Sequence, residues 1–272
     1  METNVRFMKK FGVDRNGFII TEVSIKKISP IYKHVVTCVS DIILSKYAKD
    51  IESIYLYGSV VTGKAIKGKS DLDILLVFKN NPNGIVAKNV KTLEKNLSKK
   101  YINILRGIGL AITSIQEVKN PKEKYGLLCF IKHLCVCIYG NDITVNIPKF
   151  KPTKAVAKGF NGDIAEKLEI NRRKFLKHLT TSEIKKLSQE TSKRIIRTGF
   201  SLVMPRTKSW TTNLQKSVDT FIYYYPEKKA EMTKALEWSK AGTVNKQAII
   251  DFIDSFGLWL STEFNEQIGS RT

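Results

Sequence analysis

The segments IESIYLYGS (residues 51–59) and DLDILLVF (residues 71–78) are separated by the eleven residues VVTGKAIKGKS. The first segment alternates polar and apolar side chains, and the second is wholly apolar after Asp73, so each predicts a β-strand. The glycines and lysines between them predict a loop. The sequence therefore predicts a strand, a loop and a second strand. A Gly-Ser pair closes the first strand and an Asp-Leu-Asp motif opens the second.

The two aspartates of this motif are suited to holding a divalent metal ion. Residues i and i+2 of a strand point to the same face, so Asp71 and Asp73 are expected about 7 Å apart along the chain. Carboxylate oxygens are the ligands that hard divalent cations prefer. Gly58 and Ser59, at the end of the first strand, offer backbone N–H groups and a hydroxyl to a triphosphate. A metal ion bridging the phosphates would neutralise the charge that develops as the α-phosphorus is attacked.

With these residues the sequence resembles the nucleotidyltransferase superfamily related to DNA polymerase beta, whose pattern is Gly-Ser, a spacer and Asp-x-Asp. The resemblance is closest to stand-alone bacterial enzymes, namely aminoglycoside-type adenylyltransferases and the minimal nucleotidyltransferases of toxin–antitoxin systems. It implies that Asp71 and Asp73 are catalytic and hold Mg²⁺ or Mn²⁺, and that Gly58 and Ser59 hold the β- and γ-phosphates of an NTP. Further candidates for nucleotide binding are Lys64, Ser70 and Arg197, and for each lysine of the loop the alternative is a solvated surface role.

The sequence departs from the family pattern at the third carboxylate, which active members usually carry on the next strand. The strand predicted at 108–115 contains no acidic residue. Glu117, just beyond its end, is the candidate for a displaced third carboxylate. Alternatively the general base comes from the helical part of the chain. The candidates there are Asp163, Glu166 and Glu169, for which surface ion pairs with Lys167, Arg172 or Arg173 are the competing interpretation.

The rest of the chain predicts an α/β (α+β) protein with two domains. Helices are expected at 30–49 and 85–100, and a helix or strand at 126–139. The predicted division is a nucleotidyltransferase domain with a small mixed sheet (1–147), a linker (148–158) and an all-helical bundle (159–272). The helices expected in the bundle span 161–178, 181–203, 212–224, 227–240 and 245–265.

The composition favours a polyanionic partner. The 272 residues include 46 Lys+Arg and 25 Asp+Glu, which gives a formal net charge of +21, and such a charge attracts nucleic acid and repels polycations. No apolar run approaches the ~20 residues of a membrane span, and a secretory signal is not evident. The four cysteines form no CxxC pair. Cys135 and Cys137 are expected to be same-face core residues of a strand, so a reducing cytoplasm is expected.

The predicted activity is the metal-dependent transfer of an NMP from an NTP to an acceptor hydroxyl, with release of pyrophosphate. The charge favours RNA, including tRNA, or a protein as acceptor. The alternatives are an aminoglycoside or lincosamide adenylyltransferase and a catalytically degenerate module that binds nucleotide or RNA. A third alternative is an RNA-cutting helical protein, because Arg173 and His178 fit the Arg-x4-His pattern of HEPN ribonucleases. A homodimer or a partner protein is also compatible with the sequence.

Overall fold

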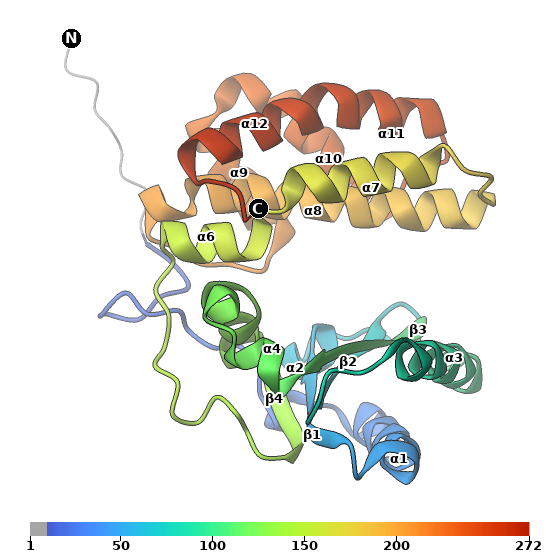
Figure 1. Cartoon of the computed structure of the whole chain (residues 1–272). Helices are drawn as coiled ribbons and strands as arrows, with labels where there is room; N and C mark the ends of the chain where they lie inside the picture. Colours follow the sequence, from blue (N-terminus) through green and yellow to red (C-terminus); the bar gives the residue numbers. More distant parts are fainter. Residues whose placement is uncertain (1–9, 272) are drawn as a thin grey trace. The chain divides into compact units, whose positions relative to one another are not determined.

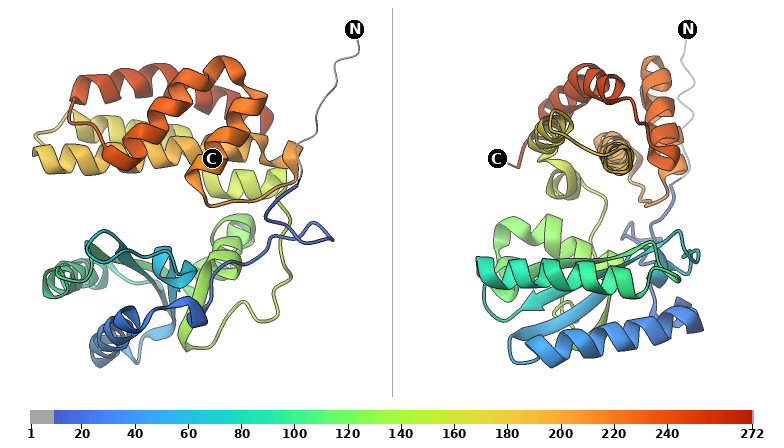
Figure 2. Two further views of the ribbon diagram at one scale, coloured as in Figure 1. Left: turned by 180° about the vertical axis from the view of Figure 1, so that it is seen from behind. Right: turned by 90° about the vertical axis from the view of Figure 1, so that its right-hand side faces the viewer.

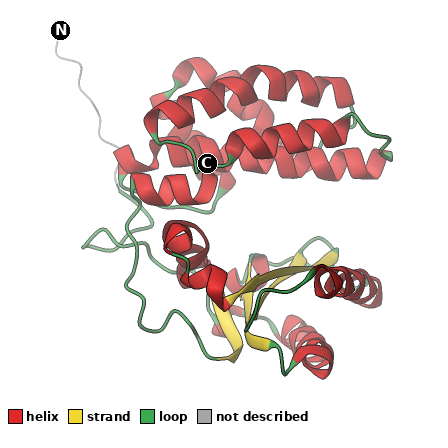
Figure 3. Ribbon diagram, viewed as in Figure 1, coloured by secondary structure: helices red, strands yellow, loops and turns green. Residues whose placement is uncertain are grey.

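The computed structural model describes residues 10–271, which form two compact units (Figure 1). One unit is Thr21–Lys149, and the other joins the described residues up to Ile20 to those from Phe150 onward. The strands of the four-stranded sheet all belong to the first unit, and the second is built of helices and loops (Figure 3). The predicted fold class, a small mixed sheet with helices followed by a helical region, is confirmed.

The sheet of the first unit has the strand order β3-β2-β1-β4. Strand β1 is antiparallel to β2 and to β4, whereas β2 and β3 are parallel. A parallel pair needs a long crossover, and helix α3 supplies it between β2 and β3. The bounds are β1 Ile51–Tyr57, β2 Asp71–Phe78, β3 Gly107–Ser114, β4 Cys135–Gly140 and α3 Gly84–Lys100.

The two faces of the sheet are covered by different helices. Alternate residues of β2 point to opposite faces. Leu72, Ile74, Leu76 and Phe78 belong to one apolar cluster, which also includes buried side chains of α3 and of α1 (Pro30–Tyr47), and Figure 2 shows both helices beside the sheet. On the other face, Leu75 and Val77 pack with Tyr55 and with residues from α4 (Ile115–Lys119) and α5 (Cys129–Leu134). Asp71 and Asp73 share this second face.

The segment predicted as helix or strand at 126–139 contains both. A π-helix at Lys124–Leu128 leads into α5, and β4 begins at Cys135. Cys135 is buried and Cys137 is half-buried, both in the cluster on the Tyr55 face of the sheet, and all four cysteines are free thiols. The predicted loop after Ser59 begins instead with one helical turn, α2 (Ser59–Thr62), which left-handed Gly63 (φ 73°) ends.

The helical unit is organised around α8, a 27-residue helix that starts with a capping box between Thr180 and Glu183. Packed aromatic rings contribute to its core, among them Phe252 and Phe256 and their partners Trp238 and Trp259. A π-helix at Ile253–Gly257 joins α11 to α12, so the helix expected at 245–265 is nearly continuous. The helices are α6 Lys154–Asn161, α7 Ile164–Phe175, α8 Thr181–Thr207, α9 Leu214–Tyr224, α10 Lys229–Ala241, α11 Lys246–Phe252 and α12 Leu258–Gln267.

Two features differ from the predicted division of the chain. The linker expected at 148–158 ends early, because the Thr153 hydroxyl accepts a bond from Val156 N and caps α6. Residues 10–20 join the helical unit, where Ile19 N donates to Phe150 O (2.8 Å) and Trp210 N donates to Phe11 O (2.9 Å). Neither pairing can be read from local sequence patterns. In the described part of the chain, no helix has the length and apolar character needed to cross a membrane.

Candidate active site

Gly58 brings the end of β1 against the Asp-Leu-Asp motif of β2. The register pairs Tyr57 with Asp73, and Gly58 follows with φ 81° and ψ −151°, a backbone conformation essentially restricted to glycine. A Cβ atom at Gly58 would lie 2.5 Å from Asp73 Oδ2. The glycine therefore allows both the turn into α2 and the close approach of the Asp73 carboxylate. The structure brings Gly58, which precedes Ser59, next to Asp73.

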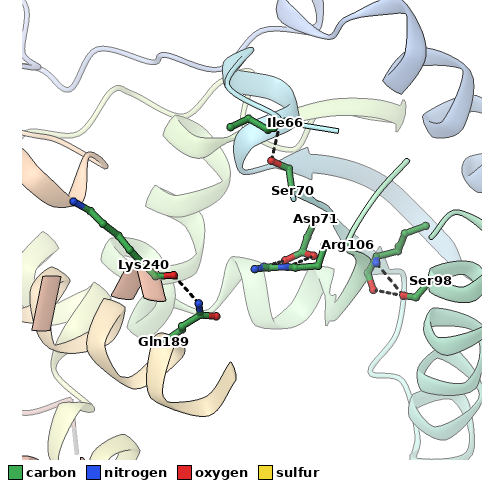
Figure 4. A network of polar contacts seen from close by, with 8 residues as sticks. Ile66, Ser70, Asp71, Ser98, Arg106, Gln189 and Lys240 are labelled. Atoms are coloured by element: carbon green, nitrogen blue, oxygen red, sulfur yellow. Dashed lines mark hydrogen bonds and ion pairs between the residues drawn. The ribbon is translucent and has the colours of Figure 1, made fainter. Parts of the chain in front are cut away.

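Asp71 forms a two-point ion pair with Arg106, which immediately precedes β3 (Figure 4). Arg106 Nε donates to Asp71 Oδ1 at 3.0 Å, and Nη2 donates to Oδ2. Arg106 N also bonds to Ser70 O at 3.0 Å, which aligns the two strand starts. Sequence reasoning missed Arg106. Its position beside Asp71 follows from the parallel pairing of β2 with β3, for which the local pattern gives no signal.

Glycines occupy the positions of β3 that lie beside the two aspartates. The register pairs Asp71 with Gly107 and Asp73 with Gly109. Cβ atoms at these glycines would lie 3.4 Å from Asp71 Oδ1 and 3.3 Å from Asp73 Oδ1. The position on the neighbouring strand from which a third carboxylate would reach Asp73 is therefore Gly109.

Glu117 does not reach this group. It lies on α4, where its Oε2 accepts a bond of 2.7 Å from the Thr113 hydroxyl, and Thr113 pairs with Val77. Four residues separate Val77 from Asp73, which is about 13 Å along a strand. The expectation that Glu117 serves as a displaced third carboxylate is corrected accordingly, because β3 carries it to the opposite end of the sheet.

The other predicted nucleotide-binding residues have different surroundings. The Ser70 hydroxyl accepts a bond from Ile66 N (2.9 Å) and closes the loop before Asp71. Lys64 is exposed, and its Nζ lies 3.6 Å from Glu22 Oε2 in a surface ion pair. Arg197 is an exposed residue of α8, in the helical unit.

Two of the three acidic candidates in the helical unit form surface ion pairs, which was the competing interpretation of these residues. Asp163 pairs with Lys167 and also with Arg194. Glu169 pairs with Arg173, four residues along α7. Glu166 is exposed in the first turn of the same helix. His178 is exposed beyond the end of α7, so it does not share a helix with Arg173.

Tyr57 borders the site as a neutral hydroxyl. Burial first, and then the negative charge of Asp73, raise the pKa of Tyr57 well above its usual value. The ring packs edge-on against Phe130, with 5.2 Å between centroids. Tyr57 is therefore a donor or acceptor of hydrogen bonds at the site and carries no charge at neutral pH.

The carboxylate pair fits a metal ion that is shared with phosphate. Asp71 and Asp73 lie on one face of β2, and both are half-buried. Within residues 10–271, no three His, Cys, Asp or Glu side chains form a group able to hold a metal ion. Mg²⁺ commonly uses one or two carboxylates and takes its other ligands from substrate phosphates and water. Among the described residues, the carboxylate pair has the chemistry for that arrangement.

Comparison with known proteins agrees with this geometry. Residues 39–124, which include both motifs, match the nucleotidyltransferase domain family. The crystal structure of spectinomycin adenyltransferase AAD(9) from Enterococcus faecialis with ATP and spectinomycin has a similar fold. Its TM-score is 0.54 at 14% identity, over 86% of this chain and 99% of that chain. No curated protein matches the sequence significantly.

The predicted resemblance to nucleotidyltransferases related to DNA polymerase beta is thereby confirmed. The chain contains a nucleotidyltransferase domain, and the protein is an NTP-dependent, phosphorus-transferring enzyme.

Proposed function

We propose that this nucleotidyltransferase moves an NMP from a metal-bound NTP to an acceptor hydroxyl, with Asp71 and Asp73 as the metal-holding residues. The observation that carries the proposal is the close approach of Gly58 to Asp73, where a Cβ atom would lie 2.5 Å from the carboxylate. Because of this approach, a backbone turn that can bind phosphate lies beside a pair of carboxylates that can bind Mg²⁺ or Mn²⁺.

The residues of the chain would divide the work as follows. Gly58 and Ser59 would bind the β- and γ-phosphates, and the carboxylates of Asp71 and Asp73 would hold the metal ion. A bound divalent ion supplies charge neutralisation at the phosphates. The acceptor hydroxyl gives its proton to water and its oxygen forms a bond to the α-phosphorus; the bond from that phosphorus to the bridging oxygen breaks, and pyrophosphate leaves. Arg106 donates to both oxygens of Asp71, so its guanidinium would compete with the metal ion for this carboxylate.

The acceptor proposed from the net charge of +21 is RNA, such as tRNA, or a protein. A small antibiotic is the second candidate acceptor, favoured by the fold shared with spectinomycin adenyltransferase AAD(9). A binding module without catalysis is favoured by one feature, the glycine at position 109 where a third carboxylate would stand.

Transfer of label from each α-³²P NTP, with Mg²⁺ or Mn²⁺ present, tests these candidates. The acceptors offered are total RNA, a protein extract, spectinomycin and a lincosamide. We expect label in RNA or protein, and none with the Asp71→Asn/Asp73→Asn variant. A matched control, Asp41→Asn/Asp50→Asn, removes two exposed acids of α1 and the turn that follows it. Label on an antibiotic would identify the antibiotic as the acceptor. Absence of transfer to every acceptor would contradict the proposed enzyme and favour the binding module.

A further inference from the structure

Helix α3 carries a row of exposed lysines on the side away from the sheet. Lys88, Lys91, Lys95 and Lys99, here called the α3 lysine face, recur at i, i+3, i+7 and i+11 and all are exposed. Residues at this spacing share one side of a helix. The opposite side is buried in the core through Val90, Leu93 and Leu97. At 1.5 Å per residue, the face extends about 16 Å along the helix.

The charge of this region is not balanced by nearby acids. Residues 53–116 contain ten Lys and Arg but three acids, Asp71, Asp73 and Glu94. Glu94 is already engaged, since it pairs with Lys91 and accepts a bond from Leu110 N (2.8 Å). Asp71 pairs with Arg106. The lysine face therefore presents a positive field that attracts a polyanion.

The C-terminal end of α3 and the turn after it are bonded to the strand and the loop that flank Asp71, within the same compact unit. Ser98 of α3 bonds to both backbone groups of Ile108 in β3 (Figure 4). The turn after α3 holds the loop before Asp71, because Gly68 N donates to Ile104 O at 2.9 Å. That loop carries the exposed Lys67 and Lys69. Because α3 and the Asp71 carboxylate belong to opposite faces of the sheet, a strand of phosphates lying on α3 would reach Asp71 around the β3 edge, past this loop.

The chemistry of the face indicates nucleic acid and not a protein partner. From Lys88 onward, the exposed residues of α3 are lysines, asparagines and a threonine. Protein interfaces are depleted in lysine at their centre and use aromatic and apolar anchors. Contacts to a phosphate backbone come instead from Lys and Arg together with Ser, Thr and Asn side chains.

We infer that the α3 lysine face binds the phosphate backbone of an RNA whose terminal hydroxyl is the acceptor of the nucleotidyl group. This inference rests on the proposed function, to which it adds the acceptor class and the surface that recognises it. Its test is binding of a fluorescently labelled RNA hairpin with a single-stranded 3′ end, measured by anisotropy at several salt concentrations.

The test variant is Lys88→Gln/Lys95→Gln/Lys99→Gln. Lys91 is kept because it pairs with Glu94. Each phosphate contact to a single strand contributes about −0.7 to the slope of log K against log salt, so the loss of three contacts should reduce its magnitude by about 2. We expect RNA affinity at low salt to fall about tenfold or more. The far-ultraviolet circular dichroism spectrum of the variant should match that of the wild type.

The matched control is Lys33→Gln/Lys46→Gln/Lys49→Gln, which removes three exposed lysines of α1 and the turn that follows it. For this control, the slope of log K for RNA binding against log salt should equal that of the wild type within experimental error. Equal losses in both variants would overturn the inference in favour of diffuse attraction by net charge. Absence of RNA binding by the wild type would also overturn it.

The two proposals fail in different ways. Suppose that RNA binding depends on the α3 lysine face but no NTP transfers label. This result would refute the proposed function and support RNA binding by the face. Transfer of label to an antibiotic or a protein, without RNA binding, would support nucleotidyl transfer and refute RNA binding by the α3 lysine face.

Discussion

Small residues surround the two aspartates of the candidate active site. Gly58 meets the Asp73 carboxylate from β1, while Gly107 and Gly109 lie beside Asp71 and Asp73 on β3. Any larger side chain at Gly58 would press directly on an oxygen that is proposed to bind metal. A Cβ atom at Gly107 would make an ordinary contact of 3.4 Å and one at Gly109 a tighter contact of 3.3 Å, so both glycines of β3 tolerate substitution better than Gly58.

Gly58→Ala should lower stability and abolish nucleotidyl transfer. Its left-handed backbone (φ 81°) and the 2.5 Å approach to Asp73 Oδ2 both oppose a Cβ atom, and such strained conformations cost about 1–3 kcal/mol. Urea denaturation measures the first effect and label transfer the second. The control is Gly68→Ala, which also has a positive φ (73°) but no atom within 4 Å of the added Cβ. Full transfer by Gly58→Ala would contradict the proposed role of this contact.

Gly109→Asp should strengthen metal binding by supplying a third carboxylate beside Asp73. Its Cβ would lie 3.3 Å from Asp73 Oδ1, with no other close neighbour, and more charged ligands raise the affinity for hard cations. We expect Mn²⁺ affinity to rise about tenfold, equivalent to about 1.4 kcal/mol. Titration of free Mn²⁺ by electron paramagnetic resonance measures it. Gly109→Asn has the same shape without the charge, and equal affinities for the two variants would refute the prediction.

Strand β3 is an edge of the sheet, and side chains of α3 satisfy its outer backbone groups. Ser98 Oγ accepts a bond from Ile108 N (2.9 Å) and donates to Ile108 O (3.2 Å). Glu94 accepts a bond from Leu110 N. Gly109 of β3 and Arg106, which precedes β3, lie beside the aspartates, so the bonds between β3 and α3 help to fix the geometry of the site.

Ser98→Ala should therefore destabilise the sheet edge. Both backbone groups of Ile108 lose their side-chain partner, and an unsatisfied polar group of this kind costs about 1–3 kcal/mol. Urea unfolding followed by circular dichroism measures the change. Thr92→Ala is the control in the same helix, because the Thr92 hydroxyl bonds only to Lys88 O of α3. An equal, small effect of the two substitutions would show that Ser98 does not hold β3.

At the scale of the whole molecule, metal and nucleotide should stabilise the protein only together. A ligand that binds the folded state at 100 times its Kd adds about 2.7 kcal/mol to the free energy of unfolding. We expect Mg²⁺ with an NTP to raise Tm by several degrees in differential scanning calorimetry, and EDTA to abolish the shift. The Asp71→Asn/Asp73→Asn variant should show no shift. A full shift in EDTA would contradict metal-mediated binding.

Local pattern was sufficient for the strands β1 and β2 and for the order of Gly58, Ser59, Asp71 and Asp73 along them. Alternation of side chains fixes which residues share a face, and a Gly-Ser turn marks where a strand ends, because both depend on residues that are near neighbours in the chain. The helices of the C-terminal half follow for the same reason. Helix α6 was not predicted, because most of it lies in the expected linker 148–158, and it starts at the cap supplied by Thr153.

The partners of those strands were decided by tertiary structure. Parallel pairing across the crossover α3 sets Gly109 beside Asp73 and Arg106 beside Asp71, and it carries Glu117 away from both. Residues 10–20 likewise join the helical unit through backbone bonds to distant residues. The physical reason is common to all of these: the period of a strand specifies its faces, but its neighbour and register depend on how the assembled helices and sheet bury their apolar surfaces.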